Sequence, residues 1–198
     1  LHEAAHGYVA RRFGDQTAYM LGRVTLNPLK HIDPIGTIAV PGFLIATSLL
    51  THAPLFVFGW AKPVPVQFAN LRNPKRDMLW VAAAGPGANF AMAILWALFL
   101  KAFVSTAGGE HAHWLLMANV GISVNLVLMA LNLLPVPPLD GGRIAVSLLP
   151  LRAARAFARI EPYGLFIIVG LLAFGLLDDV MRPLLQLVEW LLQTLLGL

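Results

Sequence analysis

Cysteine is absent from the 198-residue sequence, and charged side chains are scarce. Without thiols, neither a disulfide framework nor a thiolate metal site is possible. Only 12% of the residues are charged and 58% are hydrophobic, whereas soluble domains carry roughly a quarter charged residues. The small charged fraction argues against a soluble protein and indicates that the solvent of this chain is a lipid bilayer.

The sequence contains long apolar runs without charged residues. Four stretches contain no Asp, Glu, Lys or Arg and meet or approach the roughly 20 apolar residues that a helical membrane span requires: residues 34–61, 78–100, 114–139 and 162–177. These runs predict an all-α polytopic membrane protein, a bundle of about four to six membrane helices. No repeat or linker interrupts them, so we expect residues 1–198 to form a single domain. Leu1 already lies in a helical pattern, and we expect the N-terminal part of the first helix to be missing.

Two segments are less regular than a membrane helix. Residues 15–33 are polar and mixed, and the alternating apolar positions Met20, Val24 and Leu26 predict a small membrane-associated β hairpin. Residues 34–61 are apolar but are interrupted by several prolines and glycines. This second segment could either cross the membrane once or form a re-entrant hairpin.

The positions of the basic residues decide between these alternatives, because cytoplasmic loops of membrane proteins carry an excess of Lys and Arg. If residues 34–61 enter the membrane and return on the same side, every basic residue except Lys101 and Arg182 lies on the cytoplasmic side. If the segment crosses once, the four basic residues between positions 62 and 76 move to the other side. We therefore favour the re-entrant form. Topology also explains the net charge of +4 without a nucleic-acid partner.

The sequence HEAAH at the start of the chain has the residue types that a metal-dependent hydrolase needs. His2 and His6 are one helical turn apart, so both imidazoles project from one face and can share a metal ion. Glu3 lies beside His2, where a carboxylate can accept a proton from a metal-bound water without being a ligand. Short patterns of this kind recur by chance, and the alternative is a pair of ordinary helix histidines.

The depth of these residues in the membrane favours the metal site. Counting back from Arg11 and Arg12, a rise of about 1.5 Å per residue places the two histidines roughly 8 to 15 Å below the interface. Ionisable groups at such a depth are costly and usually functional. We therefore expect them to have a partner.

A catalytic zinc ion takes three protein ligands and keeps a fourth position for water, so a third ligand should lie elsewhere. Asp140 is the best candidate, because it directly follows the 114–139 run on the side of Arg11 and Arg12. Gly141 and Gly142 allow the backbone to turn sharply beside it. Taken alone, this stretch would predict a plain surface turn. The other acidic residues lie on the opposite side, after a basic segment or in an amphipathic tail: Glu110, Asp178, Asp179, Glu161 and Glu189.

Two asparagines also lie within the apolar runs. We interpret Asn89 and Asn125 as forming hydrogen bonds between helices. A role facing the substrate is the alternative for Asn89.

Three motifs in order, HEAAH, AGPGAN and NLLPVPPLDGG, resemble the site-2 proteases, which are zinc metalloproteases that cut within the membrane. The resemblance runs from position 2 to about position 159, and the chain looks like a compact bacterial-type member without a PDZ domain. It implies that His2, His6 and Asp140 bind one Zn²⁺ and that Glu3 is the general base. It also implies that Asn132, eight residues before Asp140, lies on the substrate or oxyanion side of the site.

The resemblance implies an intramembrane endopeptidase that hydrolyses peptide bonds in transmembrane segments of other proteins, in regulated intramembrane proteolysis. Its partners would be a transmembrane substrate protein and the lipid bilayer. We expect a bacterial inner-membrane location with the active site toward the cytoplasm. The alternative is a membrane metal transporter or metal-binding protein that uses the same His, His and Asp side chains. A transporter should show paired half-repeats, and the sequence has none.

Overall fold

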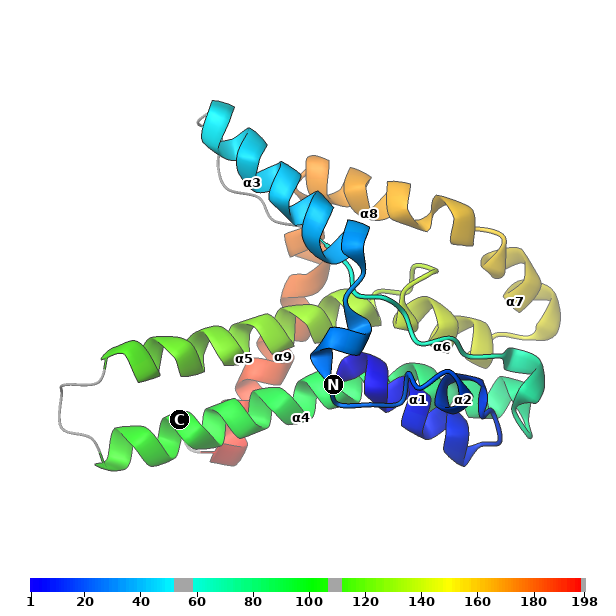
Figure 1. Cartoon of the computed structure of the whole chain (residues 1–198), viewed down its shortest axis with the longest axis horizontal. Helices are drawn as coiled ribbons and strands as arrows, with labels where there is room; N and C mark the ends of the chain where they lie inside the picture. Colours follow the sequence, from blue (N-terminus) through cyan, green and yellow to red (C-terminus); the bar gives the residue numbers. More distant parts are fainter. Residues whose placement is uncertain (52–58, 107–111, 197–198) are drawn as a thin grey trace.

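The computed structural model describes residues 1–51, 59–106 and 112–196, and its regular structure is helical (Figure 1). The α-helices are α1 (His2–Arg12), α2 (Thr17–Met20), α3 (Val40–Thr51), α4 (Pro74–Thr106), α5 (Ala112–Leu133), α6 (Asp140–Leu148), α7 (Leu151–Ala158), α8 (Gly164–Ala173) and α9 (Leu176–Leu196). Four helical segments in the described ranges are long and apolar enough to cross a membrane: Pro34–Thr51, Pro74–Ala102, His113–Leu133 and Leu151–Ala173. The expected helical architecture with several candidate spans is confirmed for these residues.

The long helix α4 supports the other elements. It runs antiparallel to α5, and α1 and α6 lie against its first half (Figure 1). Small residues allow the close approach of α4 and α5: a Cβ on Gly121 would lie 2.5 Å from the Trp96 ring. Helix α9 crosses this pair, and together the three helices form a core cluster of Ala93, Leu126, Met129, Val188 and Leu192.

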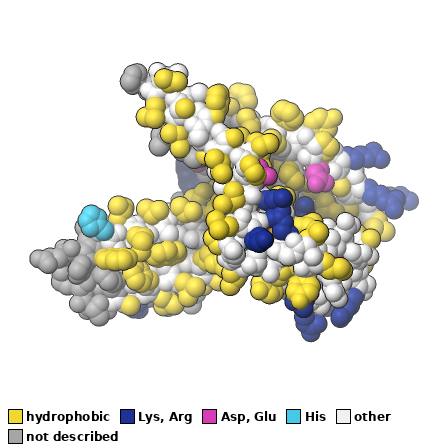
Figure 2. Space-filling model, viewed as in Figure 1, with side chains coloured by type: hydrophobic (Ala, Val, Ile, Leu, Met, Phe, Trp, Pro, Cys, Tyr) yellow, Lys and Arg dark blue, Asp and Glu magenta, His cyan; other side chains and the backbone are white. Residues whose placement is uncertain are grey.

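Apolar side chains are exposed on the surface of the helices that are candidates to span the membrane. Figure 2 shows hydrophobic side chains over the visible parts of α3, α4 and α5, whereas Lys and Arg gather toward the end where α1, α2 and α7 lie. Large apolar side chains such as Phe43, Leu49 and Leu95 are exposed. Exposed apolar side chains are unfavourable only in contact with water. In a membrane, lipid tails would cover these side chains without such a cost.

The predicted β hairpin in residues 15–33 is wrong. These residues form α2 and a 3-10 turn at Pro28–His31, and no strand forms in the described ranges. Asp15 and Asn27 explain the difference, because their side chains accept hydrogen bonds from the backbone N–H groups of Thr17 and Leu29 at 3.0 Å each. Such local bonds favour turns and helix starts over a strand ladder. Of the alternating apolar residues, Met20 and Leu26 are exposed, at 74% and 65%, and Val24 is partly buried.

The two ends of the 34–61 segment lie together. A π-helical turn (Pro34–Ala39) leads into α3, and the chain returns to it: the Trp60 N–H donates to the Gly36 carbonyl at 3.0 Å. The Thr37 hydroxyl donates to the Trp60 carbonyl at 2.8 Å. This pairing agrees with a segment that enters and returns on one side of the membrane. Residues 52–58 of the segment lie outside the described ranges.

Asp15 joins the end of α1 to the loop that leads into α4. Its carboxylate is 1% exposed and accepts hydrogen bonds from the Thr17 amide and hydroxyl and, at 2.6 Å, from the Gln67 amide. Burial acts to raise the pKa of Asp15, but these bonds and a weaker one from Asn70 together hold it below its usual value of about 3.8. The ionised carboxylate therefore stabilises the fold.

Replacing Asp15 with alanine is expected to lower the free energy of unfolding by about 1–3 kcal/mol, because partly buried N–H groups lose their acceptor. A lowered pKa in the folded state stabilises the fold above the unfolded-state pKa, and this contribution disappears as the pH falls through the lower folded-state value. The difference in melting temperature between the native protein and Asp15→Ala should thus be full at pH 6 and shrink below about pH 4. Melting in detergent across this range measures it. A difference that does not change with pH would contradict this role, and Asp178→Ala, an exposed position, is the control.

Candidate metal centre

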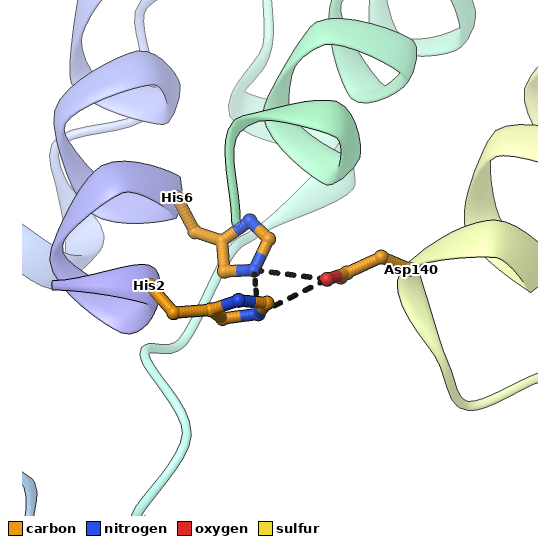
Figure 3. Close-up of side chains that lie close together, drawn as sticks. All are labelled: His2, His6 and Asp140. Carbon is orange, nitrogen blue, oxygen red and sulfur yellow. Dashed lines mark hydrogen bonds and ion pairs between the residues drawn. The ribbon is translucent and has the colours of Figure 1, made fainter. Parts of the chain in front are cut away.

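Helix α1 presents both histidines to one point. His2 and His6 occupy successive turns, and their Nε2 atoms are 3.0 Å apart (Figure 3). The rings meet edge to face, with centroids 4.7 Å apart. His6 is buried and His2 is partly buried, so the pair lies between α1 and its neighbours and not on the surface.

Asp140 reaches the same point from the start of α6. Its Oδ2 atom lies 3.1 Å from His2 Nε2 and 3.3 Å from His6 Nε2. Figure 3 shows the carboxylate pointing at the two imidazoles from the opposite side. The structure therefore brings together the three side chains that the sequence analysis selected as metal ligands, which come from two segments far apart in the chain.

The two glycines after Asp140 are required by lack of space. A Cβ on Gly141 would lie 2.2 Å from the Leu133 carbonyl oxygen, and one on Gly142 would lie 2.4 Å from the Pro137 nitrogen. Neither glycine is among the described residues with a positive φ. The glycines were expected to let the backbone turn sharply, but they lie in the first turn of α6, where close backbone contact with residues 133–137 leaves no room for a side chain. That contact packs the start of α6 against the end of α5 and the loop that follows it.

Hydrogen bonding indicates that a cation belongs between the three side chains. His6 Nδ1 lies 2.6 Å from the Val81 carbonyl oxygen, which can only accept, so Nδ1 is the donor. A neutral His6 then carries a lone pair on Nε2, and this lone pair faces the Asp140 carboxylate, which is also an acceptor. Asp140 Oδ2 is within ion-pair distance of both rings, yet it is buried and makes no hydrogen bond. Acceptors that converge in this way are stabilised by a bound cation.

The distances fit a zinc ion. In a tetrahedral zinc site with bonds of about 2.0–2.1 Å, neighbouring ligand atoms are separated by roughly 3.3 Å. The three separations here are 3.0, 3.1 and 3.3 Å. His, His and Asp donors also match the ligand types of catalytic zinc sites, which leave a fourth position for water.

Helix α4 forms the wall of the centre at Gly85, within the AGPGAN motif. A Cβ on Gly85 would lie 2.4 Å from His6 Nε2 and 2.5 Å from His2 Nε2. Small residues such as those of this motif permit close contact between helices. At Gly85, the contact is with the imidazoles themselves.

Changing Gly85 to alanine is therefore expected to displace the imidazoles and to weaken metal binding by at least about tenfold, comparable to the loss of an orienting contact at a metal site. Gly87 is the matched control on the same helix, because a Cβ there meets nothing within 4 Å. Gly87→Ala should leave metal affinity unchanged. Titration with a competing chelator measures both variants, and equal affinities for Gly85→Ala and Gly87→Ala would contradict this account of the wall.

Glu3 lies at the edge of the centre beside a cavity. Its Oε2 atom accepts a hydrogen bond from the Val64 N–H at 2.7 Å, which fixes the carboxylate. A cavity of about 480 Å³ is lined by His2 and Glu3 and by residues of the 31–61 region, including His31, Thr37 and Trp60. A molecule in this cavity would thus meet one candidate ligand and the candidate base together.

Asn132 is not brought to this centre by any contact in the described part of the chain. It lies on α5, and its side-chain amide donates to the Leu128 carbonyl of its own helix at 2.9 Å. Its role on the substrate or oxyanion side stays a prediction. Val81 and Gly85 are parts of the site that the sequence did not predict: a backbone carbonyl has no sequence signature, and neither has a glycine that makes room for a side chain of another helix.

Helical spans together with a buried His, His and Asp cluster define the class: a membrane protein with a candidate site for one metal ion. The family model of peptidase family M50 matches residues 103–175. The chain is 38% identical over 191 residues to "Putative zinc metalloprotease YwhC" of Bacillus subtilis, covering 94% of this chain and 81% of the relative. It is 33% identical over 192 residues to "Putative zinc metalloprotease Rip2" of Mycolicibacterium smegmatis, covering 96% and 68%. The chain therefore belongs to peptidase family M50, the site-2 protease family.

A third relative, "Putative zinc metalloprotease Rip2" of Mycobacterium tuberculosis, is 31% identical over 178 residues, which are 87% of this chain and 62% of the relative. No solved structure is significantly similar to this chain. The resemblance to the site-2 proteases that the three motifs carried is confirmed by these relatives, which match most of the chain.

Proposed function

We propose that this chain is a zinc-dependent intramembrane endopeptidase that hydrolyses peptide bonds in transmembrane segments of other membrane proteins. The observation that carries the proposal is the convergence of His2, His6 and Asp140, whose donor atoms lie 3.0–3.3 Å apart in a chain with apolar spans. The zinc metalloprotease names of the relatives support the choice of metal and reaction.

Each residue of the centre has a separate role in the proposed reaction. His2 and His6 would hold one zinc ion through Nε2, and Asp140 would hold it through Oδ2. When bound, zinc supplies Lewis acidity, which lowers the pKa of a coordinated water and stabilises negative charge on the substrate carbonyl. Val64 holds Oε2 of Glu3, so Oε1 is the atom that would accept the proton from the attacking water and later return it to the leaving nitrogen.

The cavity is where the substrate would lie. Besides His2 and Glu3, it is lined by apolar side chains such as Ile32, Pro41 and Trp60. A transmembrane helix hides its carbonyls in its own hydrogen bonds, so a short stretch must unwind before it can be attacked. An apolar cavity beside the base suits the side chains of such an unwound stretch.

The bacterial inner membrane is the proposed location, with the centre toward the cytoplasmic side. The gathering of Lys and Arg at the α1, α2 and α7 end supports this orientation (Figure 2). Water would reach the centre from that basic side, since α1 ends there with Arg11 and Arg12.

Removal and return of the metal tests the proposal. Purified protein in proteoliposomes should contain about one zinc per chain and should cleave a model transmembrane substrate. A chelator is expected to abolish cleavage, and added zinc should restore it. Cleavage that persists in fully zinc-free protein would reject a zinc-dependent reaction.

A further inference from the structure

The two histidines differ at their second ring nitrogen. His6 Nδ1 donates to the Val81 carbonyl, whereas His2 Nδ1 is buried and has no hydrogen-bond partner. Histidines that bind a metal through one nitrogen almost always donate the other N–H to a carboxylate, carbonyl or water, which fixes the ring. His2 therefore lacks the orienting contact that His6 has.

Asn89 of α4 carries another unpartnered buried group. Its side chain is 1% exposed, and its Nδ2 atom has no hydrogen-bond partner. Leaving a buried polar group unpaired costs about 1–3 kcal/mol. A half-turn of the amide about its Cβ–Cγ bond exchanges oxygen and nitrogen with almost no change of shape, so Asn89 can present either an acceptor or a donor at the same place.

The register of α1 against α4 brings Asn89 to the level of His2 along the two helices. The two helices run antiparallel (Figure 1), and Ala10 packs with Val81 in one core cluster. One turn further along both helices, His6 meets Gly85. A second step of the same size leads to His2 on α1 and to Asn89 on α4. Continuing in the same direction, Leu1 and Met92 line one small cavity.

We propose that Asn89 is a positioning residue of the metal centre: its side-chain oxygen accepts a hydrogen bond from His2 Nδ1 and directs Nε2 of that ring toward the metal. The inference rests on the proposed zinc site. Val81, Gly85 and Asn89 follow each other at intervals of four residues, so they form one ridge of α4. Along this ridge, the Val81 carbonyl orients His6, and Gly85 leaves room for both imidazole rings. The Asn89 amide would orient His2. The sequence indicated that Asn89 forms a hydrogen bond between helices, and the proposal names His2 on α1 as the partner in that bond.

Zinc affinity and the spectrum of the cobalt-substituted protein test this role in the whole chain. Asn89→Leu keeps the approximate shape but removes the acceptor, and it should weaken zinc binding about 10- to 100-fold. The ligand-field absorption of bound Co²⁺ should change as well, because the His2 ring is no longer fixed. Asn89→Asp keeps an acceptor oxygen and should retain affinity within a few-fold. Asn125→Leu is the matched control, because the Asn125 amide donates to the Gly121 carbonyl of its own helix.

Three results would overturn the proposal. One is an unchanged zinc affinity and cobalt spectrum in Asn89→Leu. Another is a loss in Asn89→Asp as large as in Asn89→Leu, because the centre would then need the amide as a donor. The third is an equal loss in Asn125→Leu. If Asn89→Leu does not fold, Asn89→Ala replaces it in the same comparison. If the native protein binds no zinc, the proposed function itself fails, so the two failures are distinguishable.

Discussion

Replacing Glu3 with glutamine is expected to abolish peptide-bond cleavage while zinc remains bound. Glutamine has the same shape and can still accept the hydrogen bond from the Val64 N–H, so the local structure is kept. It cannot accept a proton from water, and the loss of a general base lowers rates by about 10²–10⁴-fold. Cleavage of a model transmembrane substrate in proteoliposomes, together with zinc content, measures both halves of the expectation.

Glu161→Gln is the control for this experiment. Glu161 lies in an exposed turn and lines a different cavity from that of Glu3, so its replacement should leave turnover unchanged. Unchanged turnover in Glu3→Gln would remove Glu3 as the base. Loss of zinc together with activity would mean that Glu3 acts by holding the structure and not by moving a proton.

The same variant separates a peptidase from a membrane metal transporter that uses the same three ligands. A transporter has no clear use for Glu3 as a base, so zinc flux into vesicles should survive Glu3→Gln. A peptidase should show no such flux in either form. Zinc transport by the native protein that continues in the variant, without substrate cleavage by either, would favour the transporter.

Replacing Asp140 with alanine is expected to empty the centre of zinc. Only two imidazoles would remain, and zinc affinity should fall by more than about 100-fold, beyond the loss caused by removing an outer contact. A ligand that binds only the folded state raises the melting temperature, so added zinc should stabilise the native protein and not Asp140→Ala.

Metal content after dialysis and melting with and without zinc check this expectation. Asp179→Ala is the control, since Asp179 forms an exposed ion pair with Arg182 at 3.1 Å and is on another helix. Full zinc occupancy in Asp140→Ala would exclude Asp140 as a ligand.

Much of the candidate centre could be predicted because a metal site requires a particular number and type of ligands. Two histidines one turn apart in a segment predicted to lie in the membrane called for a further ligand, and Asp140 was the suitable acidic residue predicted on the same side. The structure places it 3.1–3.3 Å from both rings, although 134 residues separate it from His6. Its role as a ligand, and that of the histidines, stays a prediction.

The errors and omissions also have physical reasons. Alternating apolar residues predicted a strand in residues 15–33, but alternation cannot report the hydrogen bonds that Asp15 and Asn27 offer to nearby backbone groups. The contact of Gly85 with the imidazoles depends on the distance between two helices, which no local pattern encodes. Asn132 was assigned through family resemblance, and its amide is bonded within α5 in this structure.

The division of the centre between α1 and α6 has a consequence for biosynthesis. Ribosomes add about 5–20 residues per second, so roughly 7–27 s pass between the synthesis of His6 and that of Asp140. During this interval α1 and α4 can already be in the membrane and packed together, with Gly85 against the histidines. The nascent chain nevertheless has two of the three donors only. On the proposed function, neighbouring membrane proteins at the insertion site would thus be shielded from cleavage while the chain is still being made.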